Sequence, residues 1–139
     1  MGVEITCEYL GDLHCTATHG PSGQTFTTDA PVDNGGKGEM FSPTDLVATA
    51  MATCIMTIMG LVAREHGWDL AGTRARVSKE MVADPKRRIG ALTLTVRLPP
   101  GMALSDADRT CLEDAAKVCP VRQSLRAEVQ VDIDFEYPE

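Results

Sequence analysis

The sequence predicts an α+β fold, in which an antiparallel sheet packs on two main helices within one domain spanning residues 1–139. Three observations support this prediction. Several segments alternate apolar and polar side chains at every second residue, as half-buried strands do. Two other segments begin with helix-capping residues and continue with apolar residues at helical spacing. The order of these segments (three strands, a helix, two strands, a helix and a strand) is typical of an antiparallel sheet covered by helices.

The first two strands are predicted within residues 3–19, where apolar residues alternate on both sides of a Gly-Asp pair. A three-residue turn over 10–12 would place Cys7 opposite Cys15 on a shared apolar face, whereas a two-residue turn would set Cys7 against Thr16. The apolar pattern favours the first register. We expect both cysteines to pack as small core residues, because reduced cysteine behaves as a hydrophobe.

A third strand is predicted over residues 24–28, followed by a glycine-rich loop over 29–40. This loop lacks the glycine pattern of a phosphate-binding site, so it is weak evidence for a nucleotide. A strong helix start comes next. Ser42 is placed as the N-cap, Pro43 at the first helical position, and Asp45 at the position that completes a capping box.

The helix that starts at this cap is expected to run to about residue 66 and to stop at Gly67. Residues 46–63 carry no charge, and a stretch of this length is at the lower limit for crossing a membrane. However, it contains a stripe of threonine and glycine at helical spacing, and no aromatic belt or basic loop flanks it. We therefore predict a core helix that is buried on nearly all sides.

The second half of the chain predicts a hairpin, a helix and a final strand. The hairpin joins residues 73–83 to 90–98, and the second of these segments alternates as a strand covered on one face does. Ser105 is placed to cap a helix that ends near residue 118. Residues 127–137 alternate without a break and give the clearest strand in the sequence.

The charge and the N-terminus limit the partners and the location of the protein. The formal net charge is -7, which disfavours nucleic acid and anionic lipid because both require a basic patch. The N-terminus shows no basic start followed by an apolar run, so we expect a cytoplasmic protein without a secretory signal. In that reducing compartment, an odd number of cysteines argues against a structural disulfide framework.

A zinc site built from His14, His19, Cys7 and Cys15 is the obvious metal hypothesis for the N-terminal strands. Neighbouring residues of a strand face opposite ways, so His14 and Cys15 do not readily share one tetrahedral centre. The paired cysteine spacing of structural zinc sites is also missing. We therefore expect no bound metal.

Two cysteines stand in contexts that favour chemistry. Cys54 lies within the uncharged helix, and Cys119 is followed directly by a proline. Cys111 and Cys119 would have Cα atoms about 12 Å apart along one helix, beyond the reach of a disulfide. Cys54 and Cys119 have no such restriction, because each lies on an apolar helical face that must pack against something. The alternative is that both are buried spacers.

A series of short motifs resembles the signature of the osmotically inducible protein C and organic hydroperoxide resistance (OsmC/Ohr) superfamily. The motifs that precede the first cysteine of this signature, matched here by Cys54, are Asp29-Ala30-Pro31, Gly35-Gly36, Ser42-Pro43-Thr44-Asp45-Leu46, Ala50 and Ala52. The second cysteine motif of the superfamily is matched by Cys119-Pro120-Val121. The element order agrees too, so the resemblance covers nearly the whole chain and favours the OsmC-like branch.

This resemblance implies an intertwined homodimer with redox-active cysteines near the subunit interface. In peroxidase members, the cysteine that matches Cys54 attacks the O–O bond of an organic hydroperoxide and becomes a sulfenic acid. The cysteine that matches Cys119 then condenses with it to form a disulfide. A dithiol, lipoyl-linked in the hydroperoxide resistance branch, reduces this disulfide. The resemblance implies no cofactor, whether metal, flavin or haem.

The chain departs from the hydroperoxide resistance branch in the group that activates the first cysteine. Cys54 is too deep in its helix to gain from the helix N-terminus, and an apolar surrounding disfavours the thiolate, so a side chain must supply a cation. In that branch the cation is an N-terminal arginine held by a glutamate. Here no arginine precedes Arg64, and the acid comes one place later, as Asp45. Four residues could substitute for the arginine: Lys37, Arg64, His19 and Arg122. Arg122 is preferred because it lies three residues after Cys119 in the sequence.

Two functions therefore follow from the sequence. The first is an enzyme of oxidative stress defence, a thiol-dependent, peroxiredoxin-like peroxidase with Cys54, Cys119, Asp45 and Arg122 as catalytic residues. The second is a non-peroxidatic relative that binds a small apolar or electrophilic ligand at the dimer interface. The sequence does not name the peroxide or the reductant.

Overall fold

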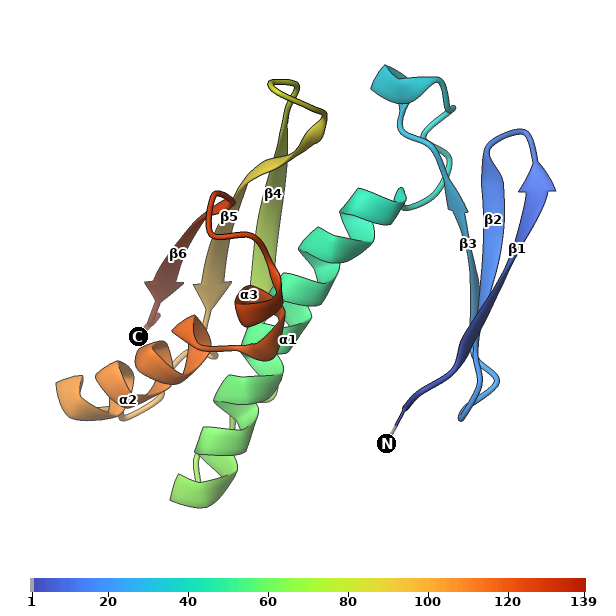
Figure 1. Ribbon diagram of the computed structural model, residues 1–139. Coiled ribbons are helices and arrows are strands. Elements are labelled where there is room, and N and C mark those ends of the chain that lie inside the picture. Colours follow the sequence, from blue (N-terminus) through green and yellow to red (C-terminus); the bar gives the residue numbers. More distant parts are fainter. Residues whose placement is uncertain (1) are drawn as a thin grey trace. The chain divides into compact units, whose positions relative to one another are not determined.

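The computed structural model describes residues 2–139 and divides the chain into two compact units, one up to Val47 and the other over residues 48–139 (Figure 1). The N-terminal unit holds a three-stranded sheet, and the C-terminal unit holds a second three-stranded sheet with helices. The fold class is α+β, as predicted. The strands form two separate sheets, one in each unit, where the sequence predicted one.

The sheet of the N-terminal unit is antiparallel and consists of β1 (Ile5–Gly11), β2 (His14–His19) and β3 (Thr25–Asp29), in that order. The predicted pairing of Cys7 with Cys15 is wrong, because Cys7 lies opposite Ala17. The turn comprises Asp12 and Leu13, whose φ angles of 53° and 63° are both left-handed, and the register shifts just before it. Leucine rarely adopts this conformation, so the apolar pattern gave no signal for this turn.

A loop with one short helical turn, η1 (Val32–Asn34), links β3 to the long helix. Its path depends on Gly36, because a Cβ atom at this position would lie 1.8 Å from the carbonyl oxygen of Ala30. No side chain fits there, so glycine is required for the loop to fold back on itself. The loop is further fixed by Asp29, whose Oδ2 accepts hydrogen bonds from the backbone N–H groups of Lys37 and Glu39, at 3.2 and 3.1 Å.

The long helix α1 (Pro43–His66) begins with the predicted capping box. The backbone N–H of Ser42 donates to Asp45 Oδ2 at 2.9 Å, and that of Asp45 donates to Ser42 Oγ at 3.1 Å. Gly67, with φ of 73°, follows its last residue as predicted.

Burial of α1 differs from the prediction, because only one face of the helix is covered. The residues of this face repeat every three or four positions: Ala48, Met51, Ala52, Ile55, Met59 and Ala63. On the other face, Thr53 and Thr57 are exposed and their hydroxyl groups donate to carbonyl oxygens four residues earlier, each at 2.8 Å. By length and mean hydropathy (2.1) α1 could cross a membrane, but core helices of soluble proteins have the same properties.

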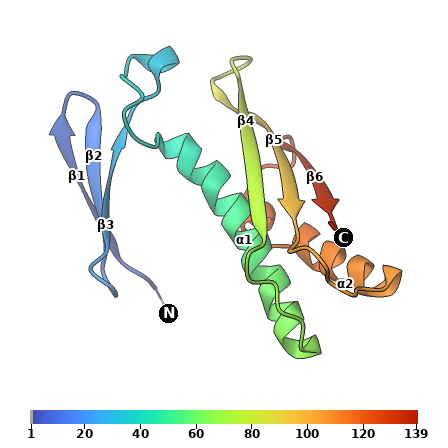
Figure 2. The same ribbon diagram turned by 180° about the vertical axis from the view of Figure 1, so that it is seen from behind.

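The sheet of the C-terminal unit is mixed and consists of β4 (Arg74–Val82), β5 (Arg88–Arg97) and β6 (Gln130–Glu136), in that order. β4 and β5 form the predicted antiparallel hairpin, whereas β6 runs parallel to β5 (Figure 2). A parallel pair requires a crossover, and α2 (Asp106–Lys117) with α3 (Pro120–Ser124) provides it. Strand alternation shows which face is buried but not the direction of the neighbouring strand.

The core of the C-terminal unit joins the covered face of α1, the inner face of β5 and one side of α2. Its fully buried side chains include Met51 and Ile55 from α1, Leu94 from β5 and Leu112 from α2. Ser105 caps α2, as the sequence predicted, and Asp108 completes a capping box. Cys119 belongs to this same core, because it is fully buried between α2 and α3.

Candidate active site

Cys119 is fixed at the N-cap of α3, a short helix that the sequence analysis did not predict. Its sulfur accepts a hydrogen bond from the backbone N–H of Arg122 at 3.5 Å, and Pro120 occupies the first helical turn. We expected Cys119 at the end of the preceding helix, which in fact ends at Lys117. The Cys-Pro pair was the available signal, because proline is favoured at the first position of a helix.

The structure brings Cys54 and Cys119 together within the C-terminal unit. The Cys119 Sγ atom lies 3.8 Å from Met51 Sδ, one helical turn before Cys54 on α1. Burial raises the pKa of the Cys119 thiol, and the neighbouring Cys54 thiol raises it further through a side-chain hydrogen bond and its charge. The hydrogen bond from the Arg122 N–H opposes this effect without cancelling it. Cys119 is therefore a neutral thiol at neutral pH, in direct contact with Cys54.

The two thiols differ in their access to solvent. Cys119 is completely buried, whereas Cys54 is half-buried and packs against the edge of the core. A solvent-accessible thiol beside a buried one suits a two-step reaction. The accessible thiol reacts with an external molecule, and the buried thiol then reacts only with the accessible one. The remaining cysteines have other surroundings: Cys7 and Cys111 are exposed, and Cys15 is half-buried on β2.

A cavity of about 220 Å³ lies beside Met51, the residue that contacts Cys119. Its walls are mostly apolar, and they include two cationic residues, Arg122 and Lys117. Arg122 is half-buried, so its charge is less screened than that of an exposed residue. The lining residues are Met51, Ala116, Lys117, Arg122, Val131 and Ile133.

The four candidate cations have different surroundings. Of the four, only Arg122, the preferred candidate, lines the cavity beside Met51. Lys37 lies 3.6 Å from Asp12 in an ion pair, and the ring of His19 is hydrogen-bonded to Ser22 Oγ at 2.6 Å. Arg64 is exposed near the end of α1, ten residues after Cys54, which corresponds to about 15 Å along the helix axis.

Asp45 has a structural task at the start of α1, because its carboxylate accepts the Ser42 N–H hydrogen bond of the capping box. It precedes Cys54 by nine residues, or two and a half turns of the same helix. Asp45 therefore fixes where the helix begins.

Comparison with known proteins agrees with this architecture. The family model described as OsmC-like protein matches residues 36–134. A crystal structure from Psychrobacter arcticus, provisionally described as an osmotic stress induced and detoxification response protein, is 41% identical with a TM-score of 0.86. The match covers 96% of this chain and 93% of that one. No curated protein matches the sequence.

Two more distant structures share the fold. The organic hydroperoxide resistance protein OsmC of Legionella pneumophila is 19% identical with a TM-score of 0.74, over 98% of this chain and 97% of that one. The organic hydroperoxide resistance protein OhrB of Bacillus subtilis is 20% identical with a TM-score of 0.69, over 98% of each chain. At these identities the likeness concerns the fold alone.

The raised pKa of Cys119 generates a prediction about its reactivity. Alkylation of Cys119 by iodoacetamide should be slower than that of exposed Cys111 at neutral pH, and should accelerate only above about pH 8.5, where ordinary thiols ionise. Peptide mass mapping of a time course at several pH values measures both rates in one sample. Equal rates for the two cysteines at neutral pH would contradict the burial and the contact described for Cys119.

Proposed function

The chain belongs to the OsmC-like protein family, and from this premise we propose that it is a thiol peroxidase that reduces organic hydroperoxides. The observation that carries this proposal is the direct contact between a half-buried thiol, Cys54, and a fully buried one, Cys119. Structures named as organic hydroperoxide resistance proteins share the fold and support the same substrate class.

In the proposed cycle, the Cys54 thiolate attacks the outer oxygen of the hydroperoxide. The O–O bond breaks, the alcohol leaves after taking up a proton, and Cys54 becomes a sulfenic acid. The Cys119 thiol then attacks the Cys54 sulfur, so that an S–S bond forms and water leaves with the sulfenic oxygen. An external dithiol, lipoyl-linked in our proposal, returns both cysteines to thiols and is itself oxidised to a disulfide.

The contrast between the two thiols supports this division of roles. Cys54 is the one that solvent reaches, so it is the one that a peroxide can meet. Cys119 is buried and its raised pKa keeps it protonated, which makes it a poor first nucleophile. Its contact with Cys54 makes it the nearest thiol to resolve a sulfenic acid formed there.

We further propose that Arg122 supplies the positive charge that stabilises the Cys54 thiolate. It is half-buried, it lines the apolar cavity beside Met51, and its backbone already holds Cys119. We assign Asp45 a positioning role, because its capping bond fixes the start of the helix that carries Cys54.

We propose that the working form is a homodimer. The register of the N-terminal sheet puts its apolar side chains on one face, where Cys7 pairs with Ala17 and Ala17 pairs with Phe26. This face is largely exposed in a single chain, and an exposed apolar sheet face of this kind marks an interface. The large exposed side chains on it are Ile5 (58%), Tyr9 (63%) and Phe26 (48%).

We also propose a cytoplasmic location, free of membrane, because the five cysteines are all free thiols that an oxidising compartment would cross-link. As for activity, two observations favour the alternative of a ligand-binding protein without turnover. The cavity is mostly apolar and the chain has no arginine before Arg64 to activate Cys54. A wild-type protein that binds hydroperoxide analogues but consumes no peroxide would select this alternative.

Replacement of Cys54 by serine should abolish peroxide consumption, because no other described thiol combines solvent access with a neighbouring thiol in contact. The assay follows loss of cumene hydroperoxide with dihydrolipoamide as the reductant. Cys111→Ser is the matched control, since Cys111 is exposed on α2 and should be dispensable. Peroxide consumption that survives in Cys54→Ser would refute the proposed cycle.

Replacement of Arg122 by glutamine should slow oxidation of Cys54 by roughly tenfold, because it removes the positive charge that we propose favours the thiolate. The backbone bond from residue 122 to Cys119 remains in this variant, so α3 should stay in place. Lys117→Gln is the control, because Lys117 lines the same cavity but is exposed. Rapid mixing with peroxide measures the oxidation rate of each variant. Equal rates for wild type and Arg122→Gln would show that Arg122 is not the cation that activates Cys54.

Sedimentation equilibrium should give twice the mass of one chain at micromolar concentration. The dimer of Phe26→Glu should dissociate at a higher protein concentration than the wild-type dimer, because the substitution places a charge on the exposed apolar face. Thr25→Glu is the control, since neighbouring residues of a strand face opposite ways. A monomer at all concentrations, or equal effects of both substitutions, would contradict this use of the sheet.

A further inference from the structure

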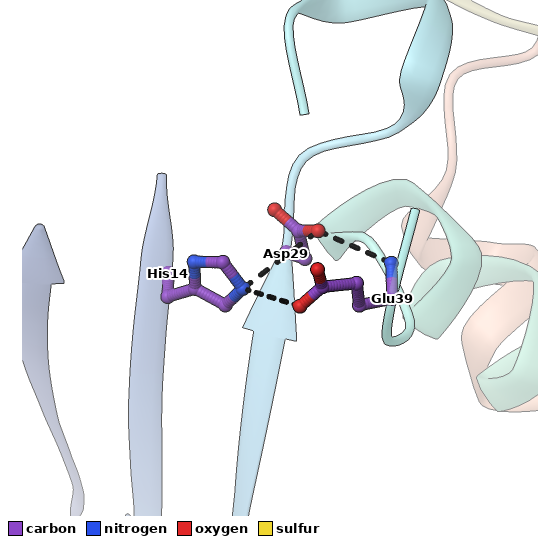
Figure 3. Close-up of side chains that lie close together, drawn as sticks. All are labelled: His14, Asp29 and Glu39. Carbon is purple, nitrogen blue, oxygen red and sulfur yellow. Dashed lines mark hydrogen bonds and ion pairs between the residues drawn. The ribbon is translucent and has the colours of Figure 1, made fainter. Parts of the chain in front are cut away.

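Three side chains of the N-terminal unit bring an imidazole nitrogen and two carboxylates together (Figure 3). His14 Nε2 lies 3.7 Å from Asp29 Oδ2 and 3.6 Å from Glu39 Oε2, and one ligand atom from each residue lies within 4.8 Å of the others. His14 starts β2 and Asp29 ends β3, where the register places them opposite each other. Glu39 comes from the glycine-rich loop.

The backbone holds these three residues in place. Asp29 Oδ2 accepts hydrogen bonds from the backbone N–H groups of Lys37 and Glu39, so the loop is tied to the carboxylate that it faces. The close approach at Gly36 fixes the same loop against Ala30. The donor atoms are therefore brought together before any ion binds, which lowers the entropic cost of binding.

His14 presents the nitrogen that a metal ion requires. Its Nδ1 atom lies 2.7 Å from the carbonyl oxygen of Asp12, which can only accept, so Nδ1 carries the hydrogen and donates it. In the neutral ring, the lone pair of Nε2 lies beside two carboxylates, and a cation bound between the three groups would favour this arrangement. Metal-binding histidines use their second nitrogen in this way, donating to a carbonyl or carboxylate that orients the ring.

Asp29 offers a second, independent sign of a missing partner. The residue is 1% exposed, and its Oδ1 atom is buried and accepts no hydrogen bond within residues 2–139. A cation bound through both oxygens of Asp29 would supply the missing partner of Oδ1.

We propose that His14, Asp29 and Glu39 form a zinc-binding site. Zinc bonds of about 2.1 Å in a tetrahedron place neighbouring ligand atoms about 3.4 Å apart. The two distances to His14 Nε2, 3.6 and 3.7 Å, need to close by only a few tenths of an ångström, and the two carboxylate oxygens lie within 4.8 Å of each other. The imidazole favours zinc over magnesium or calcium, and the two carboxylates balance its charge. The Glu39 side chain is 50% exposed, which gives the ion an entry from solvent.

This site is separate from the thiol chemistry. All three ligands belong to the N-terminal unit, whereas Cys54 and Cys119 belong to the C-terminal unit. The ion would cross-link β2, β3 and the glycine-rich loop, and the sequence analysis missed it because it tested His14 only with cysteines. Zinc binding does not rest on the peroxidase proposal, and either can fail without the other.

The test uses cobalt as a spectroscopic substitute for zinc in the full, reduced chain. One Co²⁺ ion should bind with visible d–d bands and without a thiolate-to-cobalt charge-transfer band, and one equivalent of Zn²⁺ should displace it. Glu39→Gln and His14→Gln should each weaken binding by at least about tenfold. His19→Gln is the matched control, because His19 lies on the same strand and outside the cluster.

Three results would overturn the proposal. The first is the absence of Co²⁺ or Zn²⁺ binding at millimolar metal, which would leave the cluster as an ion pair of a protonated His14. The second is equal affinity in wild type, Glu39→Gln and His14→Gln. The third is a thiolate charge-transfer band, which would place the ion on cysteine. Glu39 is exposed, so Glu39→Gln keeps the test decisive even if His14→Gln fails to fold.

Discussion

The contact between Cys54 and Cys119 depends on how α1 packs against the core of the C-terminal unit. Met51 and Ile55 are fully buried, and Cys54 lies between them in sequence at the edge of the same helical face. Successive residues of a helix are rotated by about 100°, so a shift of one position would turn Cys54 away from Cys119. Apolar packing of α1 therefore sets the geometry of the thiol pair. The capping box at Ser42 and Asp45 serves the same end by fixing where the helix begins.

The two units place different chemistry in different environments. In the C-terminal unit, burial keeps Cys119 protonated and Arg122 adds a positive charge beside an apolar cavity. In the N-terminal unit, the buried carboxylate of Asp29 accepts two backbone N–H bonds and lies beside His14 and Glu39. The first environment suits thiol chemistry with an apolar peroxide, and the second suits a cation. The amphipathic N-terminal sheet has little core of its own, which is the physical reason to expect a second copy of the chain over it.

Local signals in the sequence predicted local structure well. Ser42 and Ser105 both cap helices as predicted, because a capping box is specified by residues three apart. The motifs around Cys54 and Cys119 identified the family and hence the fold class. The β1–β2 register was mispredicted because Asp12 and Leu13 continue the left-handed conformation that begins at Gly11, and the residue types gave no signal for a left-handed leucine.

Features that depend on tertiary contacts escaped the sequence. Alternation within β6 indicated a half-buried strand but not that it pairs in parallel with β5. The exposed face of α1 was expected to be buried, because the absence of charged residues does not show which face of a helix packs against the core of its own chain. The cluster of His14, Asp29 and Glu39 forms only when strand register and loop path are both known.

The most direct test of the thiol pair is the product of a stoichiometric oxidation. The reduced protein is treated with one equivalent of cumene hydroperoxide, digested without reductant and mapped by mass spectrometry. The account predicts a Cys54–Cys119 disulfide in nearly every chain, with Cys7, Cys15 and Cys111 still free. A peroxide-treated protein in which Cys119 remains a free thiol while Cys54 is overoxidised or paired elsewhere would contradict it.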